Sequence, residues 1–295
     1  MSDHIIRGMA LNNEVRYFAA RTTDLVEYSR SIHDTSPICT AALGRLLTAG
    51  VMMGNMQKND SDILTLRINC DGPAKGLTVT ADRNGNVKGI IYEPVVVLPP
   101  NKNGKLDVGG ALGQGILSVI RDSGRREPYV GQTILVTGEI AEDITYYFME
   151  SEQIPTSVGL GVLMTTENTV EAAGGFIIQL MPFASEESIR RIEDGLKDFG
   201  SVTAHLSKGE SLLDMMKCLL GDDVSVEEDI PAQYKCNCSR ERVTKALISI
   251  GKKELTSMIE DDKEVTINCE FCESHYTFSV DELKIILAGI QKRED

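Results

Sequence analysis

Hydrophobic and polar residues alternate with a β-strand period through much of the first 183 residues. Leu64, Leu66, Ile68 and Cys70 are separated by polar side chains, which is the two-residue period of a half-buried strand. Asn84-Gly85 favours positive φ angles and stands between two apolar runs, so the sequence predicts a hairpin there. In all, short runs predict strands at residues 64–70, 77–81, 87–92, 116–120, 133–137, 158–164 and 176–181.

Two segments of the same region have helical spacing instead. Ser36-Pro37 can open a helix, since Ser is a favoured cap and Pro is favoured at the first helical position. The apolar residues that follow, from Ile38 to Met53, recur every three or four positions, and Ile140 to Phe148 do the same. Strands and hairpins dominate without a regular βαβ alternation. We therefore expect residues 1–183 to form an α+β core domain with a mostly antiparallel sheet.

Residues 184–230 have a different pattern. Ile189, Ile192, Leu196 and Phe199 form one helical stripe, and five apolar residues between Leu212 and Leu220 form a second. The segment holds 12 acidic and 5 basic side chains, a net charge of −7. It is predicted to be an acidic, amphipathic helical linker whose apolar side rests on a neighbour.

The last segment, residues 231–295, is predicted to be a small separate domain. Residues 242–250 and 281–291 have helical patterns, and residues 264–269 have a strand pattern. About 65 residues provide only a meagre apolar core. A bound metal would compensate, because structural zinc contributes about 10–16 kcal/mol to the folding of small domains.

Four cysteines supply the ligands for such a metal. They follow the pattern Cys236-x-Cys238, a gap of 30 residues, and Cys269-x-x-Cys272. Four thiolates satisfy the tetrahedral coordination of zinc, and structural sites bring two close pairs together. Each pair could also close into a disulfide, so the same residues predict a zinc site that oxidation can dismantle. His275 is close in sequence, but with four thiolates present we expect it to be a surface residue.

Composition and charge exclude several functional classes. The net charge of the chain is −14, which argues against nonspecific nucleic-acid binding and against an anionic membrane surface as a partner. We find no secretory signal and no run of about 18 apolar residues, so we expect a cytoplasmic protein with reduced thiols. Cys39, Cys70 and Cys218 stand among apolar neighbours and are predicted to be packed core thiols.

Other chemistry is less well supported by the motifs. Cys269-Glu270-Phe271-Cys272 could be a thioredoxin-like redox pair, but that motif normally opens a helix within a parallel α/β unit. Such an oxidoreductase remains one alternative. A zinc module that serves constitutively as an interaction domain is another. We find no P-loop, HExxH or GxSxG motif, and we expect no enzymatic activity.

Taken together, these features resemble the redox-regulated heat-shock holdases, the thirty-three-kilodalton heat-shock protein family. The resemblance covers essentially the whole chain and is most specific at Cys236-Asn237-Cys238-Ser239 and Cys269-Glu270-Phe271-Cys272. Thr35-Ser36-Pro37, Gly72-Pro73, Asp122-Ser123-Gly124 and Gly174-Gly175-Phe176 also match.

The resemblance implies a chaperone that works without ATP. It implies one zinc ion per reduced chain, held by Cys236, Cys238, Cys269 and Cys272. Peroxide or hypochlorite would then form the disulfides Cys236–Cys238 and Cys269–Cys272 and release zinc. The terminal domain and linker would unfold and expose a surface that binds unfolding proteins under oxidative stress, and the active form would tend to be a homodimer.

Overall fold

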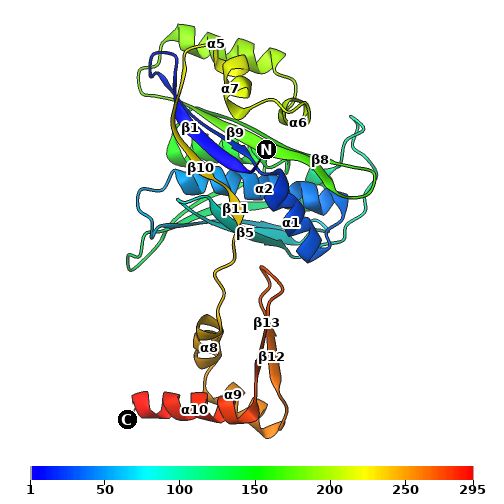
Figure 1. Cartoon of the computed structure of the whole chain (residues 1–295), viewed down its shortest axis with the longest axis vertical. Helices are drawn as coiled ribbons and strands as arrows, with labels where there is room; N and C mark the ends of the chain where they lie inside the picture. The colour runs from blue at the N-terminus through cyan, green and yellow to red at the C-terminus, as the bar shows by residue number, and fades with distance from the viewer. Residues whose placement is uncertain (1, 295) are drawn as a thin grey trace. The chain divides into compact units, whose positions relative to one another are not determined.

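The computed structural model describes residues 2–294, with side chains up to residue 289. The chain divides into two compact units, Met1–Lys235 and Cys236–Asp295. We call them the core unit and the C-terminal unit (Figure 1). The helical segment that follows residue 183 packs within the core unit.

Two antiparallel sheets build the core unit. In the first, which we call sheet A, the strand order is β10-β1-β2-β9-β8 and every neighbouring pair is antiparallel. Its strands are β1 (His4–Ala10), β2 (Val15–Arg21), β8 (Thr156–Met164), β9 (Val170–Leu180) and β10 (Val224–Pro231).

The second sheet, sheet B, has the order β11-β5-β4-β3-β6-β7. Only the short β11–β5 pair is parallel. The predicted hairpin around Asn84-Gly85 is confirmed as β4 and β5, and Gly85 has a φ of 75°. The strands are β3 (Ile63–Cys70), β4 (Gly76–Asp82), β5 (Asn86–Ile91), β6 (Gly115–Asp122), β7 (Tyr129–Ile134) and β11 (Gln233–Tyr234).

A long helix, α2 (Pro37–Asn55), lies between the two sheets (Figure 1). Every residue of α2 except Pro37 and Arg45 is buried, because both sheets pack against it and share one apolar cluster with it. Ser36 precedes the helix as predicted, although its hydroxyl donates to the carbonyl of Val96 rather than capping the helix. The other helical elements of this layer are α1 (Thr23–His33), α3 (Val108–Leu112), α4 (Ala141–Tyr147) and the π-helical turn η1 (Phe148–Glu152).

By length and composition alone, α2 is apolar enough to cross a membrane, since Pro37–Asn55 reaches a mean hydropathy of 1.3 over 18 residues. Thr40, Arg45 and Thr48 interrupt it, so it is not a continuous apolar run of the kind sought in the sequence. The helix is 89% buried within the protein, which is the environment of a core helix.

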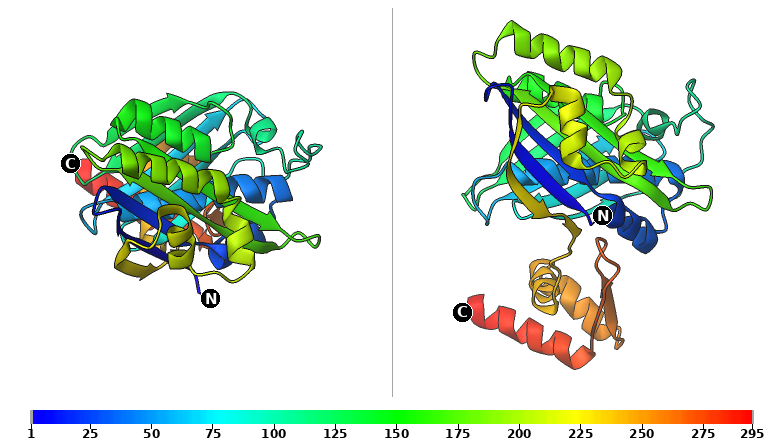
Figure 2. Two further views of the ribbon diagram at one scale, coloured as in Figure 1. Left: turned by 90° about the horizontal axis from the view of Figure 1, so that it is seen from above. Right: turned by 45° about the horizontal axis from the view of Figure 1, so that its top comes forward.

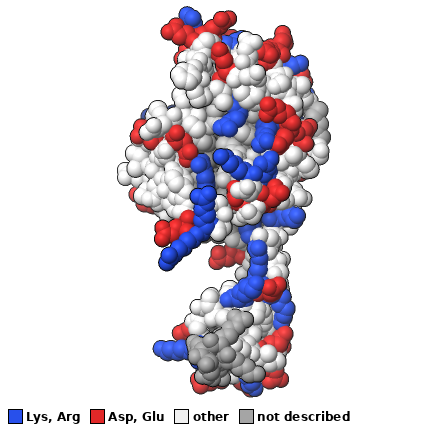
Figure 3. All heavy atoms as spheres, turned by 90° about the vertical axis from the view of Figure 1, so that its left-hand side faces the viewer, with Lys and Arg blue, Asp and Glu red and all other residues white. Residues whose placement is uncertain are grey.

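Three helices cover the outer face of sheet A: α5 (Glu186–Asp198), α6 (Val202–Ser207) and α7 (Leu212–Leu220) (Figures 1 and 2). Their apolar stripes join Tyr17 and Phe176 of the sheet in a second buried cluster. The predicted stripes are thus confirmed except at Ile189, which is half-buried outside this cluster, and the neighbour on which they rest is the sheet. Acidic side chains are prominent over α5, at the top of the face drawn in Figure 3.

Parts of the helical prediction were wrong. Residues 224–230, which we expected to belong to a helical linker, form β10 together with Pro231 and pair with β1. The charges of Glu227, Glu228 and Asp229 hide the strand signal, as is common on an exposed sheet edge. Cys218 is also not a core thiol: it is exposed, because the buried residues of α7 lie on the opposite face of the helix.

The C-terminal unit is a small α+β arrangement. It contains α8 (Arg240–Ser249), α9 (Lys252–Glu260), the hairpin of β12 (Val265–Asn268) and β13 (His275–Phe278), and α10 (Val280–Glu294). Its fully buried apolar residues within the described part are Leu247, Leu255, Phe278 and Leu283. Such a core is meagre, as the sequence predicted. The expected fold class is therefore confirmed: α+β, mostly antiparallel, with a small C-terminal unit that carries the four cysteines.

Candidate metal centre

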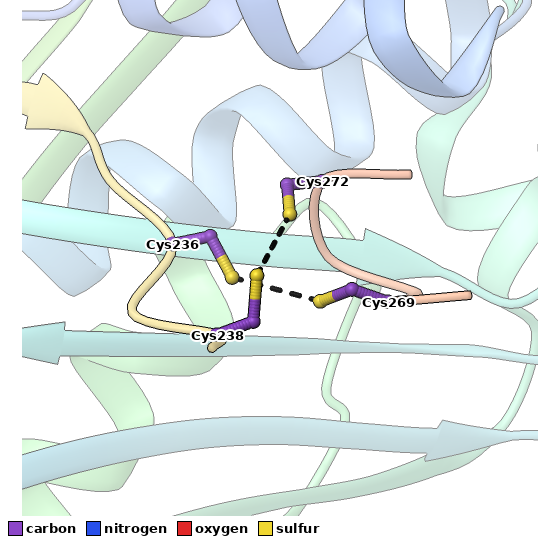
Figure 4. Close-up of side chains that lie close together, drawn as sticks. All are labelled: Cys236, Cys238, Cys269 and Cys272. Atoms are coloured by element: carbon purple, nitrogen blue, oxygen red, sulfur yellow. Dashed lines mark hydrogen bonds between the residues drawn. The ribbon is translucent and has the colours of Figure 1, made fainter. Parts of the chain in front are cut away.

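The four predicted cysteines converge at one point of the C-terminal unit. All four Sγ atoms lie within 4.8 Å of one another. Cys236 Sγ is 3.6 Å from Cys269 Sγ, and Cys238 Sγ is 3.3 Å from Cys272 Sγ. The side chains point inward from two facing turns (Figure 4). The structure thus brings together two cysteine pairs that the sequence separates by 30 residues.

Local backbone structure holds each pair. Cys236 and Cys238 lie in the irregular segment just before α8, where the Ser239 side chain caps the helix by accepting from the Arg242 N–H. Cys269 and Cys272 lie in the turn between β12 and β13. In that turn the N–H groups of Cys272 and Glu273 both donate to the carbonyl of Cys269. The irregular segment and the turn direct their sulfurs toward each other from opposite sides.

Two hydroxyl groups border the sulfurs. The Tyr276 hydroxyl donates to Cys238 Sγ at 3.1 Å, and the Ser274 hydroxyl lies 3.2 Å from Cys272 Sγ. The sequence did not single out either residue, since a serine and a tyrosine near a cysteine motif are unremarkable until the hairpin folds them back. Hydroxyl donors stabilise thiolates and orient metal ligands.

The protonation of the cluster depends on its surroundings. Burial, together with neighbouring cysteines, raises the pKa of the Cys236 thiol to about 12. Burial also opposes ionisation of Cys272, but hydrogen bonds from Ser274 and the neighbouring cysteines lower its pKa to about 7. Four adjacent thiolates repel one another, so full ionisation of this cluster requires a bound cation.

The donor set fits zinc. Sulfurs at a Zn–S distance of about 2.3 Å in tetrahedral geometry lie roughly 3.8 Å apart. The measured contacts of 3.3 and 3.6 Å and the 4.8 Å limit bracket that separation. A soft all-sulfur tetrahedron is typical of a structural zinc site, in which no coordination position is left open for a substrate.

Other candidate residues lie outside the cluster. His275 is exposed and its Nδ1 bonds to Asn268 Oδ1 at 2.7 Å, in agreement with the predicted surface role. Cys39 is buried, and its thiol donates to the carbonyl of Glu93. Cys70 is half-buried at the end of β3. The Cys269-x-x-Cys272 motif does not precede a helix, so it lacks the setting of a thioredoxin-like pair.

Comparisons with known proteins agree with this geometry. The sequence profile of the family described as Hsp33 protein matches residues 3–279. A 33 kDa chaperonin of Lachnoclostridium phytofermentans is 56% identical, covering 97% of this chain and 99% of that protein. The 33 kDa chaperonin of Clostridium novyi is 48% identical over 99% of this chain and all of its own length.

A solved structure shows the same likeness in three dimensions. The crystal structure of a 33 kDa chaperonin from Thermotoga maritima superposes with a TM-score of 0.91 and 35% sequence identity, and each chain is covered completely. The family profile spans most of the sequence, and the relatives match along their whole length. The chain therefore belongs to the Hsp33 family.

Proposed function

We propose that the protein is a redox-regulated, ATP-independent holdase chaperone. The observation that carries this proposal is the convergence of four cysteine sulfurs within 4.8 Å in a unit with only four fully buried apolar side chains among its described residues. A bound zinc ion would supply positive charge that keeps all four sulfurs as thiolates. The unit's stability then depends on a cluster that oxidants attack.

The proposed switch consumes two equivalents of hydrogen peroxide. Cys236 and Cys238 lose two electrons and form one disulfide, while Cys269 and Cys272 lose two more and form the second. Four protons are taken up and four water molecules are formed as both peroxides are reduced. The four sulfurs cease to be metal ligands, and the small apolar core is too weak to keep the unit folded.

The helical segment would respond next. We propose that residues 184–230 act as a linker. The helices of this segment, α5, α6 and α7, pack on sheet A through an apolar interface that includes Phe176 and Met216. Release of these helices would expose both the helical stripes and the sheet face. Contiguous apolar surface of that kind binds unfolding client proteins. We further propose cytoplasmic action under oxidative stress, as a homodimer when active, without catalysis and without nucleic-acid or membrane partners.

One experiment tests the proposal. Reduced, zinc-loaded protein is treated with peroxide at mild heat, while a chromogenic chelator reports zinc and light scattering reports aggregation of a heat-labile client. We expect one zinc per chain to leave as aggregation is suppressed, and dithiol to reverse both disulfides. Mass mapping should find the pairs Cys236–Cys238 and Cys269–Cys272.

A pair of variants sharpens the result. Cys269→Ser should lose zinc binding and peroxide control, whereas Cys218→Ser should behave as the wild type because Cys218 is exposed and outside the cluster. If Cys269→Ser binds zinc normally and still responds to peroxide, the proposal fails. Zinc release without a gain in holding activity would favour the constitutive zinc module, and turnover of a dithiol would favour an oxidoreductase.

A further inference from the structure

Strand β8 is an edge strand of sheet A, and helix α4 packs against part of it. The strand pairs with β9 on one side only, and it stands at the end of the strand order. Among residues 2–289, no hydrogen bond reaches the outer side of the backbone at Val158, Leu160 or Val162. Figure 1 shows β8 running along the margin of the sheet beside β9.

The pairing pattern identifies which backbone groups are free. The carbonyl of Pro155 accepts from the N–H of Leu180, so Pro155 faces β9. In an antiparallel sheet, alternate residues direct both their N–H and C=O to the same side. Residues 157, 159, 161 and 163 therefore face β9, and Val158, Leu160 and Val162 direct their donors and acceptors outward. This edge presents three free N–H groups and three free C=O groups.

The sequence of β8 lacks charges and prolines, and the β8–β9 pairing is regular up to a shift at Leu163/Met164. Natural proteins protect exposed edges with charges, prolines or bulges that prevent an incoming strand from pairing. The opposite edge of sheet A, β10, carries Glu227, Glu228, Asp229 and Pro231. The nine residues of β8, Thr156–Met164, include no charged residue and no proline, and two are glycines.

A groove of about 780 Å³ follows the edge. Residues 159–165 form its floor, Leu106 and Lys105 lie in one wall, and Phe199 and Val202 lie in the other. No carboxylate lines it, although the chain has 44 acidic residues. A second hollow continues along residues 155–157 beside Ile189, and a third reaches the fully exposed side chain of Phe183.

We propose that an extended apolar segment of an unfolded client protein adds to β8 as a sixth strand of sheet A; this rests on the proposed holdase function and specifies where the client binds. Free main-chain groups bind any extended backbone, which suits a protein with many clients. The groove is lined by no carboxylate, and of its two cations Arg45 is already paired with Glu139, so apolar side chains can enter without leaving an unpaired acidic group buried. A flexible, extended segment can enter the groove between Lys105 and Phe199, which is the form that an unfolded client offers.

The redox switch would control access to this edge. Phe199, Val202 and Thr203 of the α5–α6 region form the wall on the outer face, and the Thr203 side chain lies directly over Gly161. Release of these helices would remove that wall, while the free edge and the Lys105 wall stay in place. A client strand could then pair with β8 and lay alternate side chains along the uncovered sheet.

Residue-resolved hydrogen–deuterium exchange tests the inference in the full-length protein. The zinc-released, oxidised protein is mixed with reduced and carboxymethylated lactalbumin, a permanently unfolded client. We expect the amides of Val158, Leu160 and Val162 to exchange rapidly in the free protein and to become protected with the client. The amides of residues 157, 159 and 161 already bond to β9 and should change little, so the protection should alternate along the strand.

Two variants at one position separate the backbone from the side chain. Leu160→Pro and Leu160→Ala both shorten the side chain, but only Leu160→Pro removes the outward N–H. We expect Leu160→Pro to bind the client about ten-fold more weakly than Leu160→Ala, the effect of roughly one lost hydrogen bond. Equal affinities in two folded variants would refute the proposal.

The remaining outcomes are also decisive. If Leu160→Pro does not fold, the exchange pattern of the wild type decides alone. Client binding without protection of the three outward amides refutes strand addition and leaves the holdase function intact. Protection that appears without client and rises with protein concentration identifies a second copy as the occupant and refutes the proposal. Absence of client binding after oxidation refutes the holdase function itself.

Discussion

Asp3 has a carboxylate that is buried in the core unit with few hydrogen-bond partners. One of its oxygens accepts from the Leu25 N–H at the start of α1, while the other is buried without a partner among the described residues. Burial raises the pKa of Asp3 from 3.8 to about 6, and the hydrogen bonds from Leu25 and Asp24 offset only part of that effect. The folded state therefore binds the proton more tightly than the unfolded state.

This pKa has a consequence for stability. Because the folded pKa is raised, the contribution of Asp3 is fully present below pH 3.8 and is lost as pH rises through about 6. Asp3→Asn keeps an acceptor for Leu25 but cannot ionise. Urea unfolding of both proteins across pH 3.5–7 should show the wild type losing stability relative to Asp3→Asn over that window. Parallel curves would contradict the assignment.

At the same scale, the cysteines show what single residues in a sequence can predict. Spacing identified Cys236, Cys238, Cys269 and Cys272, because pairs of thiols have few other uses in a small domain. It did not distinguish Cys218, whose neighbours in sequence are apolar but whose side chain lies on the exposed face of α7. Tyr276 also escaped notice, since its contact with Cys238 crosses 38 residues.

At the scale of secondary-structure elements, hydrogen bonds to one carboxylate connect the start of α5 to sheet A. Glu14, in the turn before β2, accepts hydrogen bonds from the Ser185 N–H and from the hydroxyls of Ser185 and Ser188. These bonds, from Ser185 and then Ser188, lower the pKa of Glu14 to about 2. The start of the helical segment is thereby tied to a distant part of the core unit.

Glu14→Gln should loosen this end of α5. Because the folded pKa is depressed, the contribution of Glu14 is present above about pH 4.5 and is lost as pH falls toward 2. At neutral pH we expect faster amide exchange in α5 and faster onset of holding activity after peroxide than in the wild type. Glu186→Gln is the control, since its exposed side chain makes only a long contact with Arg190. Identical behaviour of the two variants would show that the hydrogen bonds to Glu14 do not stabilise the docked position of α5.

Elements with a clear turn or periodic signal of their own were predicted, whereas β10 and the hairpin of β1 and β2 were not. The β4–β5 hairpin follows from Asn84-Gly85, and the helices α2, α5 and α7 follow from their own periodicity. The β1–β10 pair joins residues more than 200 positions apart. No short window contains both partners, and the acidic residues of β10 make no apolar alternation. The strand was therefore mistaken for helix.

At the scale of the whole molecule, the two compact units draw on different sources of stability. The core unit has two large apolar clusters, whereas the described part of the C-terminal unit has four buried apolar residues and the sulfur cluster. Structural zinc contributes about 10–16 kcal/mol in small domains, which exceeds what so small a core provides.

A strong chelator under reducing conditions should therefore unfold the C-terminal unit and leave the two sheets and α2 of the core unit folded. We expect amide protection of α8, α9 and the β12–β13 hairpin to disappear, while the thermal transition of the core unit shifts little. Differential scanning calorimetry with residue-resolved exchange measures both effects, and added zinc should restore the original state. A C-terminal unit that stays protected without metal would contradict its dependence on the cysteine cluster.

The position of α2 between the sheets also has a consequence for biosynthesis. This apolar helix is complete when residue 55 leaves the ribosome, but β8 and β9 that cover it emerge more than 100 residues later, and β10 closes sheet A later still. Pairing of segments so distant in the chain is intrinsically slow. During its own synthesis, the nascent protein must thus keep this apolar helix from self-association until the last strands arrive.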